Sequence, residues 1–329
     1  MSYLQDPIGK EKMDNREKKV LCLGLLVGDF ITKPVTGMPE RGKLTLVETT
    51  ELHLGGCAVN TGVVLKKLGI NVGIAGKVGN DNLGKFILNK LNEENIEIEQ
   101  IKIDPKINTS GTSVLVHPDG ERSFIHSLGA NAKFSIEDID FNYIGKFFIL
   151  HIAGALLMPK LDGKPMAELV KKAKEIGLIV CLDTAWDSQN RWFKVLKYSF
   201  PCIDYFLPSI EEAKMITGEE KPEEIAKFLL DKGVKNVGLK MGEKGSFIMN
   251  EKEKFYFPAL KIKVVDTTGA GDGYVAGFIA GLVRGYSFEK CGLLGNLVGA
   301  KIATAIGATG GIKSWEDLIE FAKNHGYKI

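Results

Sequence analysis

The stretch Asp266–Gly273 (DTTGAGDG) places an aspartate directly after a small, flexible turn. The segment that follows has apolar residues at helical spacing, so the turn leads into a predicted helix. Glycines let the backbone approach a ligand closely, and a helix start presents unpaired N–H groups that favour an anion. Asp272 stands at this start, where a carboxylate suits a general base beside a phosphate. The stretch therefore indicates an anion site with a base, and the alternative is a plain tight connection.

A glycine pair, Gly55-Gly56, precedes a second predicted helix that ends near Leu68. The pair allows backbone N–H groups to meet a ligand, and Asn60 in the first helical turn can bond hydroxyls as donor and acceptor. Close packing of helix on strand is the alternative reason for the glycines. Asp29 follows the apolar run Lys19–Val27, a predicted buried strand, and ligands bind beyond the carboxyl ends of such strands. We expect Asp29 to hold a polar substrate, with a turn aspartate as the alternative.

Gly79–Lys85 also fits a phosphate-loop pattern, G-x-x-x-x-G-K. Phe86 stands where that pattern needs the hydroxyl that holds Mg²⁺. We therefore interpret this stretch as an ordinary turn from a strand over 72–78 into a helix.

Strands alternate with helices along the chain, which implies a mainly parallel sheet covered by helices on both faces. The predicted strands are 19–27, 72–78, 147–152, 178–182, 203–207 and 236–240, followed by a hairpin of 246–249 and 254–257. The predicted helices, besides the two after the glycine turns, are 166–176, 210–217, 222–231, 288–305 and one that Ser314 opens.

Two pieces of the chain have a different pattern. Residues 44–54 alternate apolar and polar side chains, and 112–116 and 122–126 flank a Pro-Asp-Gly turn, which is typical of a hairpin. We expect these pieces to form a small second sheet that closes over a substrate and excludes water. The predicted organisation is a flexible tail over 1–18 and one α/β domain over 19–329, with a β lid from about 30–54 and 109–128.

The composition predicts a soluble, cytoplasmic protein. Of 329 residues, 44% are hydrophobic and 26% charged, and the net charge of +2 gives no sign of a nucleic-acid or anionic-membrane partner. No apolar run reaches membrane-spanning length. The five cysteines are widely spaced without a C-x-x-C pair, which indicates reduced thiols.

Gly55-Gly56 with Asn60, together with the run Asp266–Asp272, resemble the two signature motifs of the ribokinase-like (PfkB) carbohydrate kinase family. The likeness spans about residues 19–325. It implies a ribokinase-like three-layer α/β/α sandwich with a mainly parallel central sheet and a small β-sheet lid. It also implies phosphoryl transfer from ATP to a hydroxyl of a small carbohydrate, a reaction that depends on positioning and charge neutralisation.

The resemblance assigns roles to the residues of both motifs. Asp272 resembles the catalytic base, and the amides of Gly269, Ala270 and Gly271 resemble the anion hole for the transferred phosphoryl group. The expected sugar contacts are Asp29, Gly55, Gly56 and Asn60. Asp266 and Thr268 resemble part of a monovalent-cation site that some members have, which makes potassium an optional cofactor.

The main cofactors that the resemblance implies are ATP and Mg²⁺. The expected nucleotide contacts are Lys240, Gly242, Gly245 and Asn296, of which the two glycines match the family's Gly-x-x-Gly loop around ATP. Glu212 is expected to organise Mg²⁺ indirectly. Ser209 stands where the family often has Asn, so the role of this position is open. Lys240 either meets a phosphate or faces solvent.

We therefore expect an ATP-dependent sugar kinase whose acceptor is an unphosphorylated sugar, sugar acid or polyol. A sugar phosphate would need a basic cluster, and nothing in the sequence fixes Arg41, Lys43 or Arg122 of the lid inward. One alternative is a nucleoside kinase of the same fold, for which Phe124 is the obvious aromatic in the lid hairpin.

Two further alternatives concern other functions, and one hypothesis concerns assembly. A dehydrogenase fits the G-x-G-x-x-A pattern at 271–276, but the acid required about 20 residues further on is missing. A non-catalytic sugar-binding regulator would not need Asp272. The apolar positions of the lid also suit a homodimer interface.

Overall fold

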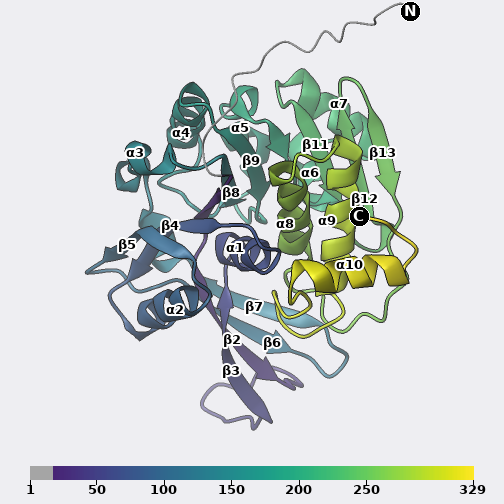
Figure 1. The fold of residues 1–329 in the computed structure, drawn as a ribbon. Coiled ribbons are helices and arrows are strands. Elements are labelled where there is room, and N and C mark those ends of the chain that lie inside the picture. Colours follow the sequence, from purple (N-terminus) through teal and green to yellow (C-terminus); the bar gives the residue numbers. More distant parts are fainter. Residues whose placement is uncertain (1–17) are drawn as a thin grey trace, which may run out of the picture.

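The described part of the chain is built on one large sheet. In a computed structural model, residues 18–329 are described, so the predicted tail lies outside the described residues apart from Lys18. Within 18–329, nine strands form a sheet in the order β13-β12-β11-β10-β9-β8-β1-β4-β5 (Figure 1). In chain order they are β1 (Val20–Gly24), β4 (Val72–Gly79), β5 (Glu97–Asp104), β8 (Ile149–Ala155), β9 (Ile179–Thr184), β10 (Tyr205–Phe206), β11 (Asn236–Lys240), β12 (Ser246–Asn250) and β13 (Lys254–Phe257).

The strands from β11 to β5 in this order run parallel, and the hairpin β12–β13 adds two antiparallel strands at one edge. Buried strands of this kind are apolar on both faces because helices cover each side. Alternate residues of β1 show this, since Val20 and Cys22 belong to one core whereas Leu21 and Leu23 belong to the other.

Helices cover both faces of this sheet and complete the three layers. On one face lie α1 (Cys57–Lys67), α2 (Asn82–Glu93), α8 (Ala270–Val283), α9 (Phe288–Ile302) and α10 (Trp315–Asn324). On the other lie α3 (Phe141–Ile144), α4 (Lys164–Glu175), α5 (Trp192–Leu196), α6 (Ile210–Thr217) and α7 (Pro222–Asp231). The predicted α/β architecture is confirmed. None of the helices within residues 18–329 is long and apolar enough to cross a membrane.

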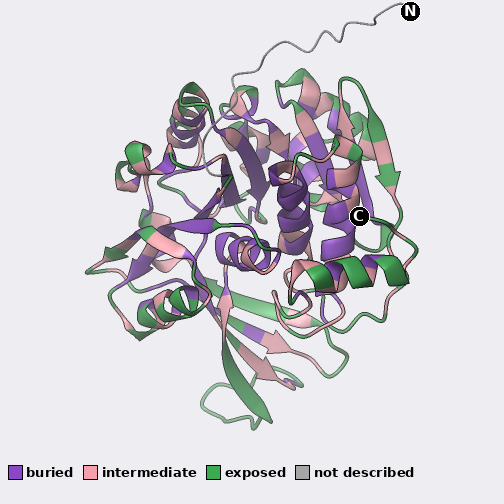
Figure 2. Cartoon of the chain, in the orientation of Figure 1, coloured by how far each residue is buried: buried purple, intermediate pink, exposed green. Residues whose placement is uncertain are grey.

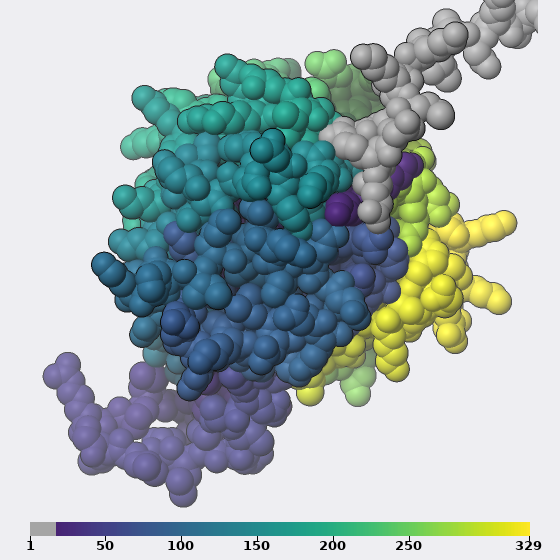
Figure 3. Space-filling model, turned by 60° about the vertical axis from the view of Figure 1, so that its left-hand side comes forward, coloured from purple at the N-terminus to yellow at the C-terminus, as the bar shows by residue number. Residues whose placement is uncertain are grey.

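The lid is a separate four-stranded sheet in the order β3-β2-β6-β7. Its strands are β2 (Val27–Lys33), β3 (Thr49–Gly55), β6 (Gly111–Val116) and β7 (Arg122–Ser127). Figure 2 shows that its strands are mostly half-buried or exposed, in contrast to the buried central sheet. Figure 3 shows its N-terminal part, in purple, projecting from the main body. The sheet therefore rests on the body by one end rather than by a broad face.

The predicted strand Lys19–Val27 is wrong as a single element. The chain leaves the central sheet after Gly24 and enters the lid at Val27, so Asp29 lies inside a lid strand instead of following a central strand. The run stays buried throughout, and no polar residue marks the change of sheet. Gly24 permits the exit, because a Cβ there would lie 2.0 Å from the carbonyl oxygen of Ala153.

Two other local predictions were tested. Leu44 and Leu46, assigned to the alternating pattern of the lid, lie outside strand β3 and are 80% and 86% exposed. The phosphate-loop pattern at Gly79–Lys85 is a strand-to-helix turn, as predicted. There the Asp81 carboxylate caps α2 by accepting from the Gly84 amide at 2.8 Å.

Candidate active site

The start of α8 forms the candidate anion site. Its N-cap, Gly269, has a left-handed backbone (φ 73°), and a Cβ there would lie 2.3 Å from the carbonyl oxygen of Ala308. Only glycine fits both requirements. The Ala270 amide already donates to the Thr267 carbonyl at 3.1 Å. Of the predicted anion hole, the Gly271 amide is therefore better placed than that of Ala270, and the Asp272 amide lies beside it in the first turn.

Asp272 is held by the first turn of another helix. The side-chain amide of Asn60 in α1 donates to Asp272 Oδ2 at 2.9 Å. Burial raises the pKa of Asp272, and Asn60, Lys240 and Cys57 oppose that rise. A raised pKa moves a carboxylate toward the range in which a general base works well near neutral pH.

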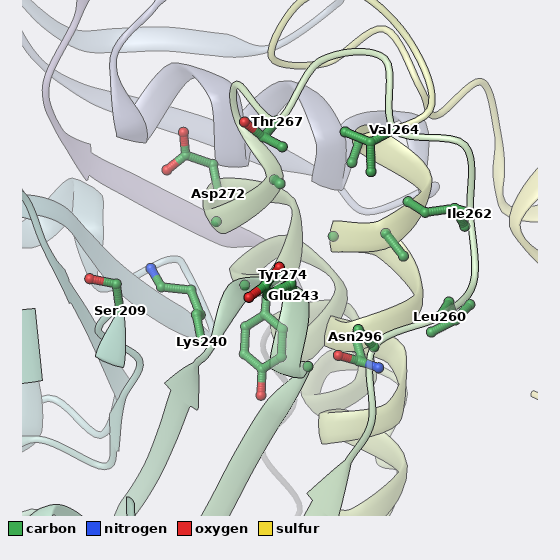
Figure 4. Close-up of a pocket in the computed structure, with 18 of the residues that line it drawn as sticks. Ser209, Lys240, Glu243, Leu260, Ile262, Val264, Thr267, Asp272, Tyr274 and Asn296 are labelled. Atoms are coloured by element: carbon green, nitrogen blue, oxygen red, sulfur yellow. The ribbon is translucent and has the colours of Figure 1, made fainter. Parts of the chain in front are cut away.

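Lys240 and Asp183 form an ion pair beside this base. They come from the carboxyl ends of β11 and β9, and Lys240 Nζ lies 2.6 Å from Asp183 Oδ2. In Figure 4 the Lys240 side chain points into the cavity on the same side as Asp272. Burial, with help from Glu212, raises the pKa of Asp183 to about 7 although Lys240 acts to lower it. Several carboxylates thus share one ammonium group in a buried place.

Ser209 and Glu212 have a local structural role as well. The Ser209 hydroxyl accepts from the Glu212 amide at 3.3 Å, and Glu212 Oε2 accepts from the Ser209 amide at 2.9 Å, which forms a capping box for α6. Glu212 Oε2 also accepts from the Thr184 hydroxyl at 3.1 Å. Ser209 therefore has a structural role as the N-cap of α6.

A cavity of about 980 Å³ opens between α8, α9 and the ends of β9 and β11. Its polar wall contains Asp183, Glu212, Lys240 and Asp272. Its other wall is apolar and includes Leu260, Ile262 and Val264 on the segment between β13 and α8 (Figure 4). One charged end and one apolar end suit a nucleotide, whose phosphates and base differ in the same way.

Gly242, Gly245 and Asn296 all line this cavity, together with Lys240. Gly245 has φ 89°, and a Cβ there would lie 1.9 Å from the carbonyl oxygen of Phe257. Asn296 is fixed by donating to the Pro258 carbonyl at 2.8 Å and accepting from the Ser246 hydroxyl at 3.4 Å. The four predicted nucleotide contacts are thus brought to one cavity from three elements.

A second cavity of about 190 Å³ lies between the lid and the main body. Asp29, Thr112 and His126 form a polar row across β2, β6 and β7 that faces it, which we call the acceptor row. The Thr112 hydroxyl lies 3.0 Å from His126 Nδ1. Gly55 is required beside this row, because a Cβ there would lie 2.0 Å from Asp29 Oδ2. Burial raises the pKa of Asp29 and lowers that of His126.

Asp272 lies near both cavities, because it lines the larger one and is bonded by Asn60 of α1, whose start lines the smaller one through Gly56 and Cys57. Three contributors escaped the sequence analysis: Thr112, His126 and Cys57. Asp183 lines the larger cavity from the carboxyl end of β9, and its place directly after the predicted strand 178–182 was the available signal. His151 is fully buried within β8 and lines neither cavity.

The predicted monovalent-cation site does not fit a free cation. The Asp266 carboxylate accepts from the amides of Thr268 at 2.7 Å and Gly307 at 2.8 Å. A guanidinium nitrogen of Arg122 lies 2.6 Å from Oδ1. A positive charge of the protein therefore already faces this carboxylate.

The comparisons with known proteins agree with this geometry. Residues 17–315 match the model of the pfkB family of carbohydrate kinases. An ATP-dependent 6-phosphofructokinase of Thermoanaerobacterium thermosaccharolyticum is 32% identical over 302 residues, which cover 90% of this chain and 91% of that protein. A 2-dehydro-3-deoxygluconokinase of Bacillus subtilis is 28% identical and covers 86% and 90%. The crystal structure of a ribokinase from Thermotoga maritima superposes with a TM-score of 0.82 at 26% identity, covering 93% and 100%.

The fold and the site define a phosphotransferase that acts on an alcohol group. The chain belongs to the pfkB family of carbohydrate kinases.

Proposed function

We propose that this protein is an ATP-dependent kinase that phosphorylates one hydroxyl of a small, uncharged carbohydrate. The position of Asp272 carries this proposal, since it lines a nucleotide-sized cavity and is hydrogen-bonded by Asn60 of α1, the helix whose start borders the smaller cavity that the acceptor row faces. A base between the two is what direct transfer from donor to acceptor requires.

The residues present fit ATP with Mg²⁺ in the larger cavity. Lys240 supplies a cation near the start of α8, where a Cβ on Gly271 would lie 3.7 Å from its Nζ. Glu212 and Asp183 supply carboxylate oxygens, the donors that Mg²⁺ prefers. When bound, Mg²⁺ neutralises charge on the phosphates. Potassium, the optional third cofactor, has no support in the geometry around Asp266.

In the proposed reaction the acceptor lies against the acceptor row, with Asp29 accepting from its hydroxyls. The Asp272 carboxylate takes the proton from the reacting hydroxyl as its oxygen attacks the terminal phosphorus of ATP. The bond to the bridging oxygen breaks, and ADP leaves. The Gly271 and Asp272 amides and Lys240 stabilise the charge on the transferring phosphoryl group.

The charges around the smaller cavity favour an uncharged acceptor. Among the described residues that line it, Arg122 is the one arginine or lysine, and its charge is balanced by Asp266. Asp29 adds a negative charge. A sugar phosphate or sugar acid would meet no free cation here, although a relative is named for a phosphorylated sugar.

A nucleoside is the second candidate acceptor. Phe124 lines the smaller cavity, and its ring is the aromatic group on which a base would stack. The polar acceptor row favours a compact polyol over this alternative. The acceptor panel below distinguishes the two.

The test is acceptor-dependent release of ADP from Mg·ATP over a panel of sugars, polyols, sugar acids, nucleosides and sugar phosphates. We expect a response to a neutral sugar or polyol in the wild type. Asp272→Asn should lose about 10²–10⁴ of that rate while it keeps its affinity for ATP. Equal rates in the variant and the wild type would refute the assignment of the base. A response confined to nucleosides or to sugar phosphates would refute the proposed acceptor.

We also propose that two copies associate through the outer face of the lid. Phe30, Leu52 and Ile125 lie on this face, opposite the acceptor row, and are 41%, 37% and 56% exposed. Exposed apolar side chains on a sheet are a common contact surface. Sedimentation should give a dimer, and Phe30→Lys a monomer. A monomeric wild type would exclude this interface. Because ATP is the proposed donor, we place the enzyme in the cytoplasm.

A further inference from the structure

Asp266 lies just before the start of α8, which forms the candidate anion site. It is 5% exposed and stands three residues before Gly269, whose left-handed backbone starts α8. One carboxylate oxygen accepts from the Thr268 amide, and the other accepts from the Gly307 amide on the neighbouring C-terminal segment. The carboxylate therefore sets the path of the chain into the anion site. A cation that neutralises the Asp266 carboxylate therefore also affects the backbone conformation before α8.

The balancing charge comes from the lid. Arg122 is the first residue of β7, and its guanidinium lies 2.6 Å from Asp266 Oδ1, with 18% of its side chain exposed and 2% of that of Asp266. Burial by itself raises the pKa of Asp266, but the bonds from Arg122, Gly307 and Thr268 outweigh it and lower the pKa. Both groups are thus charged, and the pair is largely shielded from water, where an ion pair is weakly screened.

This ion pair is also the link between two parts of the protein. Within residues 18–329, no other salt bridge joins the lid strands to the main body; those of Lys33 and His53 remain inside the lid. The outer residues of β7 are exposed, so packing there adds little. The end of the β6–β7 hairpin is therefore tied to the body by the same contact that neutralises Asp266.

We propose that the Arg122 guanidinium takes the place of a monovalent cation at Asp266. Closure of the lid then also fixes the backbone of the anion site at the start of α8. Arg122 is then a positioning residue, because it acts on the phosphoryl site through Asp266 and Thr268. A potassium ion would have to share Asp266 with a guanidinium, and the two positive charges repel. The enzyme therefore works at full rate without potassium. This inference rests on the proposed kinase function.

The test measures binding of Mg²⁺ with adenylyl imidodiphosphate, a non-hydrolysable ATP analogue, by calorimetry in potassium chloride and in tetramethylammonium chloride at equal ionic strength. Wild-type affinity should agree within about twofold in the two salts. Arg122→Ala should bind about tenfold more weakly without potassium, as expected for loss of a charged hydrogen bond, and potassium should restore most of that loss. Arg41→Ala, which removes an exposed lid charge, is the matched control and should behave as the wild type.

Melting temperatures in the same two salts provide a readout that needs neither nucleotide nor acceptor. Potassium should raise that of Arg122→Ala and leave the wild type unchanged. If the wild type binds no nucleotide, the proposed function fails. The melting temperatures in the two salts would still test whether Arg122 replaces potassium at Asp266. If Arg122→Ala does not fold, Arg122→Lys replaces it and should stay indifferent to potassium, because the charge is kept.

Two results would overturn the inference. One is a wild type whose analogue affinity or melting temperature rises in potassium, since a cation would then bind beside Arg122. The other is an Arg122→Ala variant that matches Arg41→Ala in both salts, since the ion pair would then position nothing.

Discussion

The side-chain amide of Asn60 donates to Oδ2 of Asp272 across a distance of 2.9 Å, although 212 residues separate them in the chain. Each residue lies in the first turn of its helix, α1 or α8, and both helices pack in the same core. The expected sugar contact and the expected base are therefore fixed to each other by the fold. Preorganisation of this kind removes orientational cost from the reaction.

The first prediction concerns this hydrogen bond. Asn60 opposes the rise in the pKa of Asp272 that burial causes, so Asn60→Ala should raise that pKa further. We expect the acidic limb of the pH profile of kcat/KM to move up by about one unit, the size of one charge-assisted hydrogen bond. Asn82→Ala, at an exposed position of α2, is the control. An acidic limb that stays in place would mean that Asp272 is not the group being titrated.

The second prediction concerns stability against pH. Burial raises the pKa of Asp183 from 3.8 to about 7. Between these values the folded protein keeps a proton that the unfolded chain has lost, so the contribution of Asp183 to stability falls as pH rises toward 7. His151, whose pKa burial lowers to about 3, contributes in the opposite direction over much of the same range. Urea unfolding at several pH values should therefore show the effect as a difference: Asp183→Asn should gain stability relative to the wild type as pH rises toward 7.

Asp231→Asn is the control for this series, because Asp231 is an exposed residue at the end of α7. It should keep the slope of the wild type. An Asp183→Asn variant with an unchanged slope would show that Asp183 is ionised in the folded protein at all these pH values.

The third prediction uses two glycines with the same backbone conformation. Gly269 and Gly285 have φ 73° and 72°, but a Cβ meets the Ala308 carbonyl only at Gly269 and open space at Gly285. Gly285→Ala should cost about 1 kcal/mol in unfolding free energy, the strain of a left-handed residue. Gly269→Ala should cost at least about 2 kcal/mol more, because the backbone must also move. An equal loss of unfolding free energy in the two variants would mean that the backbone before α8 can move away from Ala308 without strain.

The fourth prediction concerns the acceptor. Gly55→Ala puts a methyl group where Asp29 Oδ2 lies, so Asp29 must turn away from the acceptor row. We expect the KM for the acceptor to rise about tenfold or more while the KM for ATP is unchanged, since a lost hydrogen bond to a charged group has this size. Gly111→Ala in β6 is matched, with its nearest atoms 3.5 Å away, and should alter neither value. An effect on ATP alone would remove Asp29 from the acceptor site.

Much of the fold was predictable because residues that end helices and strands stand at the ends of many of its elements. Helices α6 and α7 and strand β11 have the predicted bounds, since glycine or proline marks their ends. Strand β5 is absent from the predictions, because charged residues interrupt its apolar ones at the sheet edge. The change of sheet after Gly24 left no polar signal. The pairing of β2 with β3 and β6 reveals it.

The candidate site likewise contains residues that the sequence predicts and residues that only the structure reveals. Asp272, Asn60 and the glycine turns stand in short motifs whose chemistry is visible in sequence. Thr112 and His126 join Asp29 only through the register of β2, β6 and β7, which no local pattern encodes. The contact of Arg122 with Asp266 depends on how the two sheets sit together. Pairing between distant segments is the information that a single sequence lacks.

The two faces of strand β2 have a consequence for how such an enzyme changes over generations. Asp29 faces the smaller cavity and Phe30, its neighbour, faces outward, so a single inserted residue would exchange the faces for everything beyond it. Point substitutions on either face leave the other intact. Preference for a new acceptor can therefore evolve by replacing side chains. It cannot evolve by an insertion or deletion of one residue in β2, because that change would turn the outward side chains toward the cavity.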